Sequence, residues 1–409
     1  MSRRHDEYMV ALDLGSSTAR AAVACWRADG ELVLEGYAEA PSRGVARGII
    51  VDLPAAAEAI RQAVEGAANL ARVKVCTLFA AAATPFARGF NSRGCIGIPH
   101  EDKLVRGPDA AAALAAANRV SLPADRTIAE VYSQGFTLDD VRGIRNPVGM
   151  ACGRLEAEQH VVSDSASALA NLRQAVRKAG YHLEAPIYAP LAAAEAVIEP
   201  EEKRLGAAHI DIGAEKTAVS VYERGYPRYT RIIPVGARHI ARDLAIGLNI
   251  RLADAENVQR TCGIPEARRP RANGAAEKIE VPSPDGGSQL IPLWRVAAIV
   301  RARAEEILEL AGKELDRSGC AAAAAKAVLT GGFCRIPEAL ATAHRVLRRP
   351  VRIGIVELET ILPQFAPDPT QAVVFGTLER GVCHRERRFD RRFAEPRFRA
   401  LLRRVATWL

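Results

Sequence analysis

Two short turns, far apart in the chain, carry the residues whose types and spacing could do chemistry. Each turn follows an apolar stretch and begins with aspartate, an aliphatic residue and glycine, as Leu12-Asp13-Leu14-Gly15 and as Ile210-Asp211-Ile212-Gly213. A second apolar stretch follows each turn and ends at another turn that contains glycine. Two matched hairpins so far apart indicate an internal duplication of domains.

These turns are suited to a ligand that carries phosphate. Backbone N–H groups and hydroxyls gathered in a turn can hold phosphate oxygens, and glycine lets the backbone approach closely. A carboxylate at the mouth of a turn can hold Mg²⁺ directly or through water, so Asp13 and Asp211 are the predicted metal residues. Two later glycines, after a buried strand, would let the backbone approach an adenine and its sugar. The nucleotide-binding residues predicted in this way are Asp13, Gly15, Ser16, Ser17, Thr18, Asp211, Gly213, Thr217, Gly331 and Gly332.

The number of these turns decides between two interpretations. One turn of this kind, taken alone, is better explained as an ordinary tight hairpin. Two copies followed by Thr330-Gly331-Gly332 favour a nucleotide site. We therefore expect the two turns to grip phosphates from opposite sides of one cleft.

The composition fits a soluble globular protein of more than one domain. The chain has 409 residues, of which 49% are hydrophobic and 25% charged, which excludes disorder, collagen and coiled coil as descriptions of the whole chain. It contains no run of 18 uncharged apolar residues, so we expect no transmembrane helix and a cytoplasmic chain. The eight cysteines form no C-x-x-C pair, so neither a zinc site nor a disulfide framework is expected.

Positive charge is concentrated at the C-terminus. Residues 384–409 hold nine arginines against three acidic residues, which is +6 of the chain's net +8. Because a nucleic-acid binder spreads its charge over a folded face, we expect no nucleic-acid partner.

The last residues have the pattern of an amphipathic helix. After Pro396, which suits a first helical turn, apolar residues recur at helical spacing with arginines on the opposite face. Such a helix, with Phe and Trp on its apolar side, fits the surface of an anionic membrane; the alternative is a terminal helix packed on the protein's own body. The predicted membrane residues are Phe398, Leu401, Leu402, Val405, Trp408, Leu409, Arg399, Arg403 and Arg404.

The elements that position the turns follow from periodicity and from glycine and proline. We expect helices at 55–71, 108–119, 164–180, 293–316 and 369–381, the third entered at Ser163-Asp164. Residues 84–160 form a small α+β unit inserted in the first domain. Residues 263–292 form a loop with one short strand, residues 326–333 form a buried strand, and a basic linker begins at residue 384.

The motifs together resemble a known family. The two phosphate turns and Leu329-Thr330-Gly331-Gly332 are similar to the motifs of the actin, Hsp70 and sugar-kinase superfamily. Over nearly the whole chain the sequence further resembles the bacterial cell-division protein FtsA family. The segments that carry this narrower resemblance are residues 40–44, 47–52, 91–94, 145–150, 165–168, 190–196 and 234–236.

The resemblance implies an α/β, actin-like two-lobe ATPase fold, made of duplicated ribonuclease-H-like domains with an inserted small α+β subdomain in the first lobe. It implies ATP between the lobes, polymerisation, and tethering of the FtsZ ring through the FtsZ C-terminal tail on the inner face of the cytoplasmic membrane. It also implies that the protein recruits later division proteins. The implied divisions are 1–83 with 161–205, 84–160, 206–383 with an outer subdomain at about 230–325, 384–395 and 396–409.

The second turn departs from the family pattern. Relatives usually read Asp-Ile-Gly-Gly-Gly-Thr-Thr-Asp, whereas this chain reads Asp211-Ile212-Gly213-Ala214-Glu215-Lys216-Thr217-Ala218. The substitutions remove two glycines and a carboxylate that could orient water, and Glu215 brings negative charge that Lys216 offsets. Gln259 stands where relatives often have lysine, while Glu256 remains for the ribose. We therefore expect ATP binding with weak or no hydrolysis.

No catalytic base is assigned. Asp211 and Glu195 are the candidates, the latter because the resemblance aligns it with a glutamate near the nucleotide. Two other functions share this fold: a scaffold for pilus or secretion assembly, and a small-metabolite kinase. The kinase would need a catalytic base in the cleft, for which the sequence offers no convincing motif.

Overall fold

Two sheets with the same topology form the centre of the molecule, and the computed structural model describes them within residues 7–27, 31–264, 277–283, 287–320 and 324–390. In the first sheet three strands are antiparallel and two more are added in parallel beside the first of them, and a short strand lies at the far edge. Its order is β11 (His182–Tyr188), β6 (Thr77–Ala82), β1 (Glu7–Leu14), β2 (Thr18–Trp26), β3 (Leu32–Pro41) and β19 (Glu359–Thr360).

The second sheet repeats this arrangement. Its order, from the parallel edge, is β18 (Val351–Ile353), β17 (Lys326–Thr330), β12 (Ala207–Ile212), β13 (Thr217–Glu223) and β14 (Tyr226–Ile233). In both sheets the aspartate of the turn pairs with the residue seven positions later, Asp13 with Arg20 and Asp211 with Ala218. The duplication predicted from the two turns is therefore confirmed.

A third sheet forms a separate projection. It is entirely antiparallel, in the order β7 (Arg88–Gly97), β10 (Arg154–Ser165), β8 (Arg126–Leu138) and β9 (Val141–Ile144), and α2 (Gly107–Ala117) packs on it. Helix and strand meet closely because Gly94 has no side chain: a Cβ there would lie 2.1 Å from the Ala117 nitrogen. The inserted α+β subdomain is thus present, and the residue limits of the subdomains stay predictions.

Helices cover the central sheets and extend the second lobe. On the first lobe, α1 (Leu53–Ala71) begins at Asp52, whose carboxylate accepts the Ala55 N–H at 3.0 Å. The other helices are α3 (Ala166–Lys178), α4 (Ala189–Val197), α5 (Pro200–Leu205), α6 (Arg238–Leu248), α7 (Leu252–Cys262), α8 (Leu293–Arg317), α9 (Ala339–Leu347) and α10 (Ala372–Asp390). Short elements are β4 (Val45–Ala46), β5 (Ile49–Ile50), β15 (Lys278–Pro282), β16 (Ser288–Pro292), and the 3₁₀ turns Gly332–Arg335 and Pro369–Gln371.

One buried cluster joins the two lobes. It contains Phe79 from the first sheet, Tyr222 from the second, and Leu191 and Phe375 from the helices α4 and α10. These helices touch at the backbone, because a Cβ on Gly376 would lie 2.0 Å from the Ala192 carbonyl oxygen. The hydrophobic core is therefore continuous between the lobes and does not stop at either sheet.

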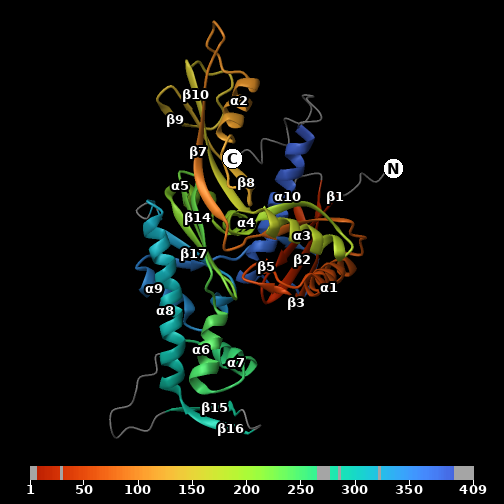
Figure 1. Cartoon of the computed structure of the whole chain (residues 1–409), viewed down its shortest axis with the longest axis vertical. Coiled ribbons are helices and arrows are strands. Elements are labelled where there is room, and N and C mark those ends of the chain that lie inside the picture. The colour runs from red at the N-terminus through yellow and green to blue at the C-terminus, as the bar shows by residue number, and fades with distance from the viewer. Residues whose placement is uncertain (1–6, 28–30, 265–276, 284–286, 321–323, 391–409) are drawn as a thin grey trace.

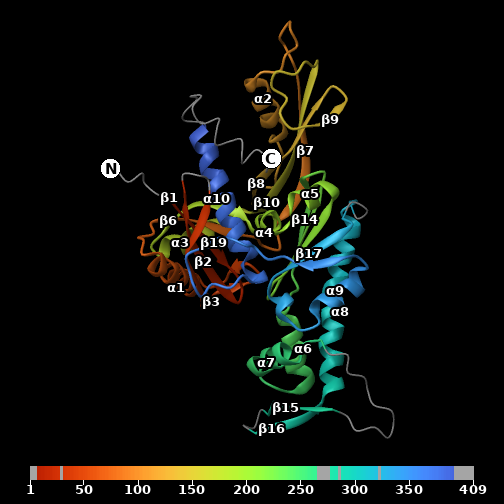
Figure 2. The same cartoon turned by 180° about the vertical axis from the view of Figure 1, so that it is seen from behind.

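The molecule is long, with distinct projections at its two ends. Both views place the inserted sheet at one end and the hairpin β15–β16 at the other, with α8 spanning much of the distance (Figure 1, Figure 2). Helix α10 runs from the centre toward the end that carries the insert (Figure 1, Figure 2). Within the described part of the chain, no helix has the length and apolar character needed to cross a membrane.

Three predicted elements need correction. Ser165, not Ser163 or Asp164, caps α3, since its hydroxyl accepts the Ala168 N–H at 3.3 Å. The region 263–292 contains a hairpin of two strands instead of one strand. Helix α10 continues to Asp390, so residues 384–390 of the predicted linker are helical. The rest of the linker and the predicted membrane helix 396–409 lie outside the described residues.

Candidate functional site

The two phosphate turns have the same local structure. In the first, the Gly15 N–H donates to the Thr18 carbonyl at 3.1 Å, and in the second the Gly213 N–H donates to the Lys216 carbonyl at 3.0 Å. Each turn is therefore a tight hairpin. The two residues between the bonded pair lie at the end of the sheet. The close packing of Gly236 fixes the second turn, because a Cβ there would lie 2.5 Å from the Gly213 oxygen.

The turns meet across the space between the lobes. Arg238, at the start of α6 in the second lobe, donates to the Ser16 carbonyl of the first turn at 3.3 Å. Glu215, in the second turn, accepts the Arg47 N–H of the first lobe at 2.9 Å. Side chains of the second lobe thus contact both the first turn and the β4–β5 loop, as convergence of the turns requires.

Lys216 lines the same small cavity as Asp13. Its ammonium donates to the Ala83 carbonyl at 2.7 Å, at the end of β6. Burial lowers the pKa of Lys216, against the attraction of Asp13, Asp211 and Asp164. Burial also raises the pKa of Asp13 to about 6, with Arg20 and Lys216 opposing the rise. The pKa of Asp211 is raised by burial too, although the Thr330 hydroxyl donates to its carboxylate at 3.0 Å.

The predicted adenosine residues differ in what surrounds them. Gly331 has φ of 89°, and a Cβ there would lie 2.5 Å from the Ile212 oxygen, so the residue must be glycine. A Cβ on Gly332 would meet no atom within 4 Å, which leaves open space beside its backbone. The half-exposed carboxylate of Glu256 lies 3.3 Å from Arg238. This side of the site fits a nucleoside.

In the part of the site that is expected to hold phosphate, several polar groups already have partners within the protein. The Ser16 hydroxyl accepts the Gly48 N–H at 3.3 Å, the Ser17 carbonyl accepts the Ser42 N–H at 2.9 Å, and the Thr217 hydroxyl donates to the Val235 carbonyl at 2.8 Å. The cavity lined by Asp13 and Lys216 holds about 30 Å³, room for about two waters. Beside Asp13, a divalent metal would meet two resident cations: the Arg20 guanidinium, 3.8 Å from that carboxylate, and the Lys216 ammonium on the wall of the same cavity.

Glu195 does not join this cluster. It lies in α4, where its carboxylate is 3.5 Å from Arg380 and its carbonyl accepts a hydrogen bond from Lys203 at 3.0 Å. The role in catalysis considered for Glu195 therefore has no support from its contacts. Arg380 also pairs with Glu130 and stacks over Tyr132 at 4.5 Å, so Glu195 belongs to a network between α4, β8 and α10.

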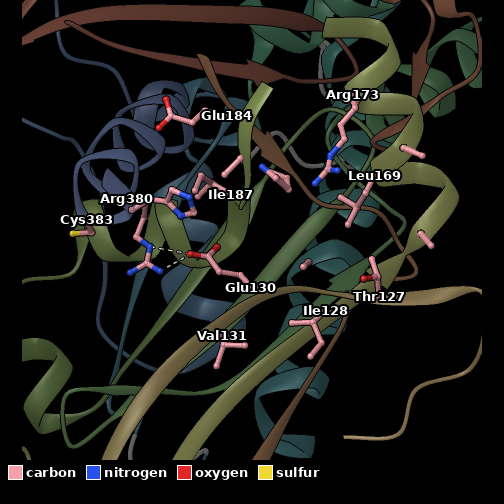
Figure 3. Close-up of a pocket in the computed structure, with 16 residues that line it drawn as sticks. Thr127, Ile128, Glu130, Val131, Leu169, Arg173, Glu184, Ile187, Arg380 and Cys383 are labelled. Atoms are coloured by element: carbon pink, nitrogen blue, oxygen red, sulfur yellow. Dashed lines mark hydrogen bonds and ion pairs between the residues drawn. The ribbon is translucent and has the colours of Figure 1, made fainter. Parts of the chain in front are cut away.

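A groove missed by the sequence analysis lies beside that network. Its volume is about 600 Å³, and its walls are the first half of β8, helix α3, strand β11 and the C-terminal part of α10 (Figure 3). Glu130 pairs with Arg380 (Figure 3), and it also accepts the Tyr188 N–H at 2.8 Å. The groove combines β8, α3 and β11, which lie within residues 126–188, with α10, which is distant in the sequence, and no local motif marks it.

Comparison with known proteins agrees with this geometry. Residues 208–376 match the family model described as Cell division protein FtsA, and residues 87–163 match that of the SHS2 domain inserted in FTSA. The sequence is similar to Cell division protein FtsA of Pseudomonas aeruginosa, 31% identical over 91% of this chain and 89% of the relative. That of Neisseria meningitidis is also 31% identical, over 86% and 84%.

Solved structures with this fold are more distant in sequence. A chain of the PilM–PilN type IV pilus biogenesis complex superposes with a TM-score of 0.63 at 18% identity, covering 91% of this chain and 98% of that one. MreB5 of Spiroplasma citri bound to AMPPNP gives 0.50 at 14%, covering 95% and 100%. These likenesses confirm the predicted actin-like fold. With relatives of 31% identity aligned over most of their length, the chain belongs to the FtsA family of cell-division proteins.

Proposed function

We propose that this chain is a division scaffold that polymerises on the inner face of the cytoplasmic membrane and tethers FtsZ to it. The observation that carries the proposal is its relation to FtsA over nine-tenths of the chain, with the SHS2 insert present. The pilus scaffold has only a shared fold at 18% identity in its favour, whereas the relatives at 31% identity are division proteins. Because these relatives are cell-division proteins, they also favour a scaffold over a metabolite kinase.

The FtsZ tail would dock on the outer part of the second lobe. Three large apolar side chains are exposed there: Ile246 at the end of α6, Leu252 at the start of α7 and Leu290 in β16. Ile246 is 82% exposed, and the Gln289 side chain donates to the Leu248 carbonyl at 3.4 Å, which holds β16 beside α6. Exposed apolar side chains on neighbouring elements suit an interaction with a partner peptide.

ATP would bind between the lobes with its base beside Gly332 and its ribose near Glu256. The open space at Gly332 and the half-exposed Glu256 carboxylate support this. Because Ala218 replaces the aspartate that relatives usually carry in the second turn, we propose binding without fast turnover. ATP would then favour assembly of the polymer, and membrane attachment would come from the C-terminal amphipathic segment.

The test is binding of an FtsZ C-terminal tail peptide, measured by fluorescence anisotropy, together with electron microscopy on lipid monolayers with ATP, ADP or no nucleotide. We expect the peptide to bind and filaments to form with ATP. Ile246→Glu should weaken peptide binding at least about tenfold, the effect of ~1.4 kcal/mol. Ile355→Glu, which changes an exposed isoleucine outside the outer subdomain, is the matched control and should leave binding unchanged. Absence of peptide binding to the intact chain would contradict the proposal.

A further inference from the structure

The basic side chains near the two turns differ in how closely they are bound within the protein. Lys216 donates to the Ala83 carbonyl at 2.7 Å, and Arg20 donates to the Glu39 carboxylate at 3.1 Å. Both side chains therefore make a hydrogen bond of ordinary length. Arg238 is different, because each of its contacts is 3.3 Å or longer.

Arg238 contacts three parts of the predicted nucleotide site. Its Nη1 atom donates to the Ser16 carbonyl of the first turn at 3.3 Å and lies 3.5 Å from Glu215 in the second turn. Its Nε atom lies 3.3 Å from the carboxylate of Glu256, the predicted ribose residue. The side chain is 22% exposed, and its Nη2 atom makes no hydrogen bond within the described part of the chain. The guanidinium therefore keeps donor groups for a ligand beside the turns.

Glu215 does not depend on Arg238 for its partners. One of its carboxylate oxygens accepts the Arg47 N–H at 2.9 Å. The other accepts a hydrogen bond from Arg242 at 2.8 Å, which is shorter than the 3.5 Å to Arg238. A movement of the Arg238 guanidinium toward a bound anion would therefore leave the buried Glu215 carboxylate with a counter-charge.

Gln259, at the position where relatives often have lysine, has a structural role here. It is buried, and its side-chain amide donates to the Ala237 carbonyl at 3.2 Å. This contact holds α7 against the start of α6, from which Arg238 extends. The positive charge that relatives often have at position 259 is therefore absent from that position, while Arg238 brings one to the same two helices.

A nucleotide brings negative charge to turns whose own polar groups are already engaged. The Ser16 hydroxyl accepts the Gly48 N–H, and the Thr217 hydroxyl donates to the Val235 carbonyl. A guanidinium is always charged and offers several N–H donors in one plane, which match the oxygens of a phosphate. Arg238 has this chemistry in contact with the first turn.

We infer that Arg238 binds the phosphates of the nucleotide and supplies the positive charge that Gln259 does not. The inference rests on the proposed function, because it concerns the ATP that is proposed to bind between the lobes. It makes the affinity for nucleotides with phosphate depend on Arg238, whereas the affinity for adenosine, which has no phosphate, does not.

The experiment measures the affinity of the full chain for ATP and for adenosine by displacement of a fluorescent ATP analogue. Arg238→Gln should weaken ATP binding at least about tenfold, because a charge-assisted contact is lost, and should leave the affinity for adenosine unchanged. Arg238→Lys, which keeps the charge without the planar donors, should recover part of the loss. Thermal unfolding without nucleotide checks that each variant is folded.

The matched control is Arg303→Gln. The Arg303 side chain is 27% exposed and also contacts α6, where it pairs with Asp243 at 2.6 Å, but it comes from α8. Its loss should leave ATP binding unchanged. An equal loss of ATP binding in Arg303→Gln and Arg238→Gln would overturn the inference, because the effect would then come from a disturbed α6.

The remaining outcomes separate the inference from the proposed function. A wild-type chain that does not bind ATP contradicts the proposed ATP binding, and the inference with it. A wild-type chain that binds ATP, together with Arg238→Gln of the same ATP affinity, overturns the inference alone. A variant that loses adenosine and ATP by the same factor also overturns it, since Arg238 would then shape the site without contacting phosphate.

Discussion

Ala218 decides what the second phosphate turn can do to a bound nucleotide. It pairs with Asp211 in the sheet and is buried, at the position where relatives usually carry an aspartate that could orient water. We therefore expect ATP turnover well below ~1 s⁻¹, the lower end for ordinary enzymes. Phosphate release measured beside nucleotide affinity checks this. Asp211→Asn is the comparison variant, and sustained turnover above that rate, abolished in the variant, would refute the expectation.

Glu202 is a buried residue whose charge contributes to stability. Its buried carboxylate pairs with Arg352 at 2.5 Å and with Lys326 at 3.0 Å, linking α5 to β17 and β18. Burial raises the pKa of Glu202, but hydrogen bonds from Arg352 and Lys326 outweigh it and lower the pKa to about 2. Since the unfolded value is higher, the carboxylate stabilises the fold above about pH 4.5 and loses that effect as the pH falls toward 2.

Replacing Glu202 should therefore have a pH-dependent effect. Because both partners are partly exposed, Glu202→Gln should cost about 1–3 kcal/mol at pH 7, less than a fully buried pair would, and much less near pH 2. Urea unfolding at several pH values measures this. The control is Glu201→Gln, which removes an exposed carboxylate next to it and should cost under about 0.5 kcal/mol. An equal cost at both pH values would show that Glu202 acts through packing and not through charge.

At the scale of elements, local signals predicted most of the fold. The two hairpins, α8 and the inserted sheet follow from spacing, glycine and capping, which act over a few residues. The prediction of a linker from residue 384 was wrong because it rested on the charge of the segment. Arginine and glutamate are charged, but both also favour helix. Arg385 in fact extends α10 by binding Glu184 at 2.8 Å.

The site was predictable only in part, because local sequence signals act over a few residues. Both turns could be found because each carries its own motif. The partners of Lys216 and Glu215 could not, since Ala83 and Arg47 are distant in sequence and meet them only in the folded chain. Gly48 is a local feature that agrees with this contact, because a side chain there would displace the Lys216 ammonium.

The contact between α4 and α10 makes the next prediction. Gly376→Ala would place a methyl 2.0 Å from the Ala192 oxygen, so the helices must move apart in the core shared by the two lobes. We expect a loss of about 1–3 kcal/mol, the usual cost of overpacking. The matched control is Gly312→Ala in α8, where the nearest atom lies at 3.7 Å and the change should add about 0.5–1 kcal/mol through helix propensity. Urea unfolding measures both, and two changes of the same sign would contradict the packing argument.

At the scale of the whole molecule, the last described helix and the elements of the proposed FtsZ surface lie toward opposite ends (Figure 1). Helix α10 leads toward the end with the inserted sheet, and the chain beyond it carries the predicted membrane segment (Figure 1). The surface of Ile246, Leu252 and Leu290 belongs to the other end, next to β15–β16 (Figure 2). A tether needs this separation, because one end must face lipid while the other stays accessible to FtsZ.

Attachment to lipid should therefore leave FtsZ binding intact. We expect the full chain to sediment with anionic vesicles and to bind the tail peptide there with the affinity measured in solution. Leu402→Glu with Trp408→Glu should abolish sedimentation, since two carboxylates on the apolar face oppose its insertion among anionic lipids. The same double variant should keep the tail affinity in solution, which separates loss of the membrane segment from loss of fold. If the vesicle-bound chain binds the peptide tenfold more weakly than the free chain, the two ends do not act independently, and the arrangement proposed here is wrong.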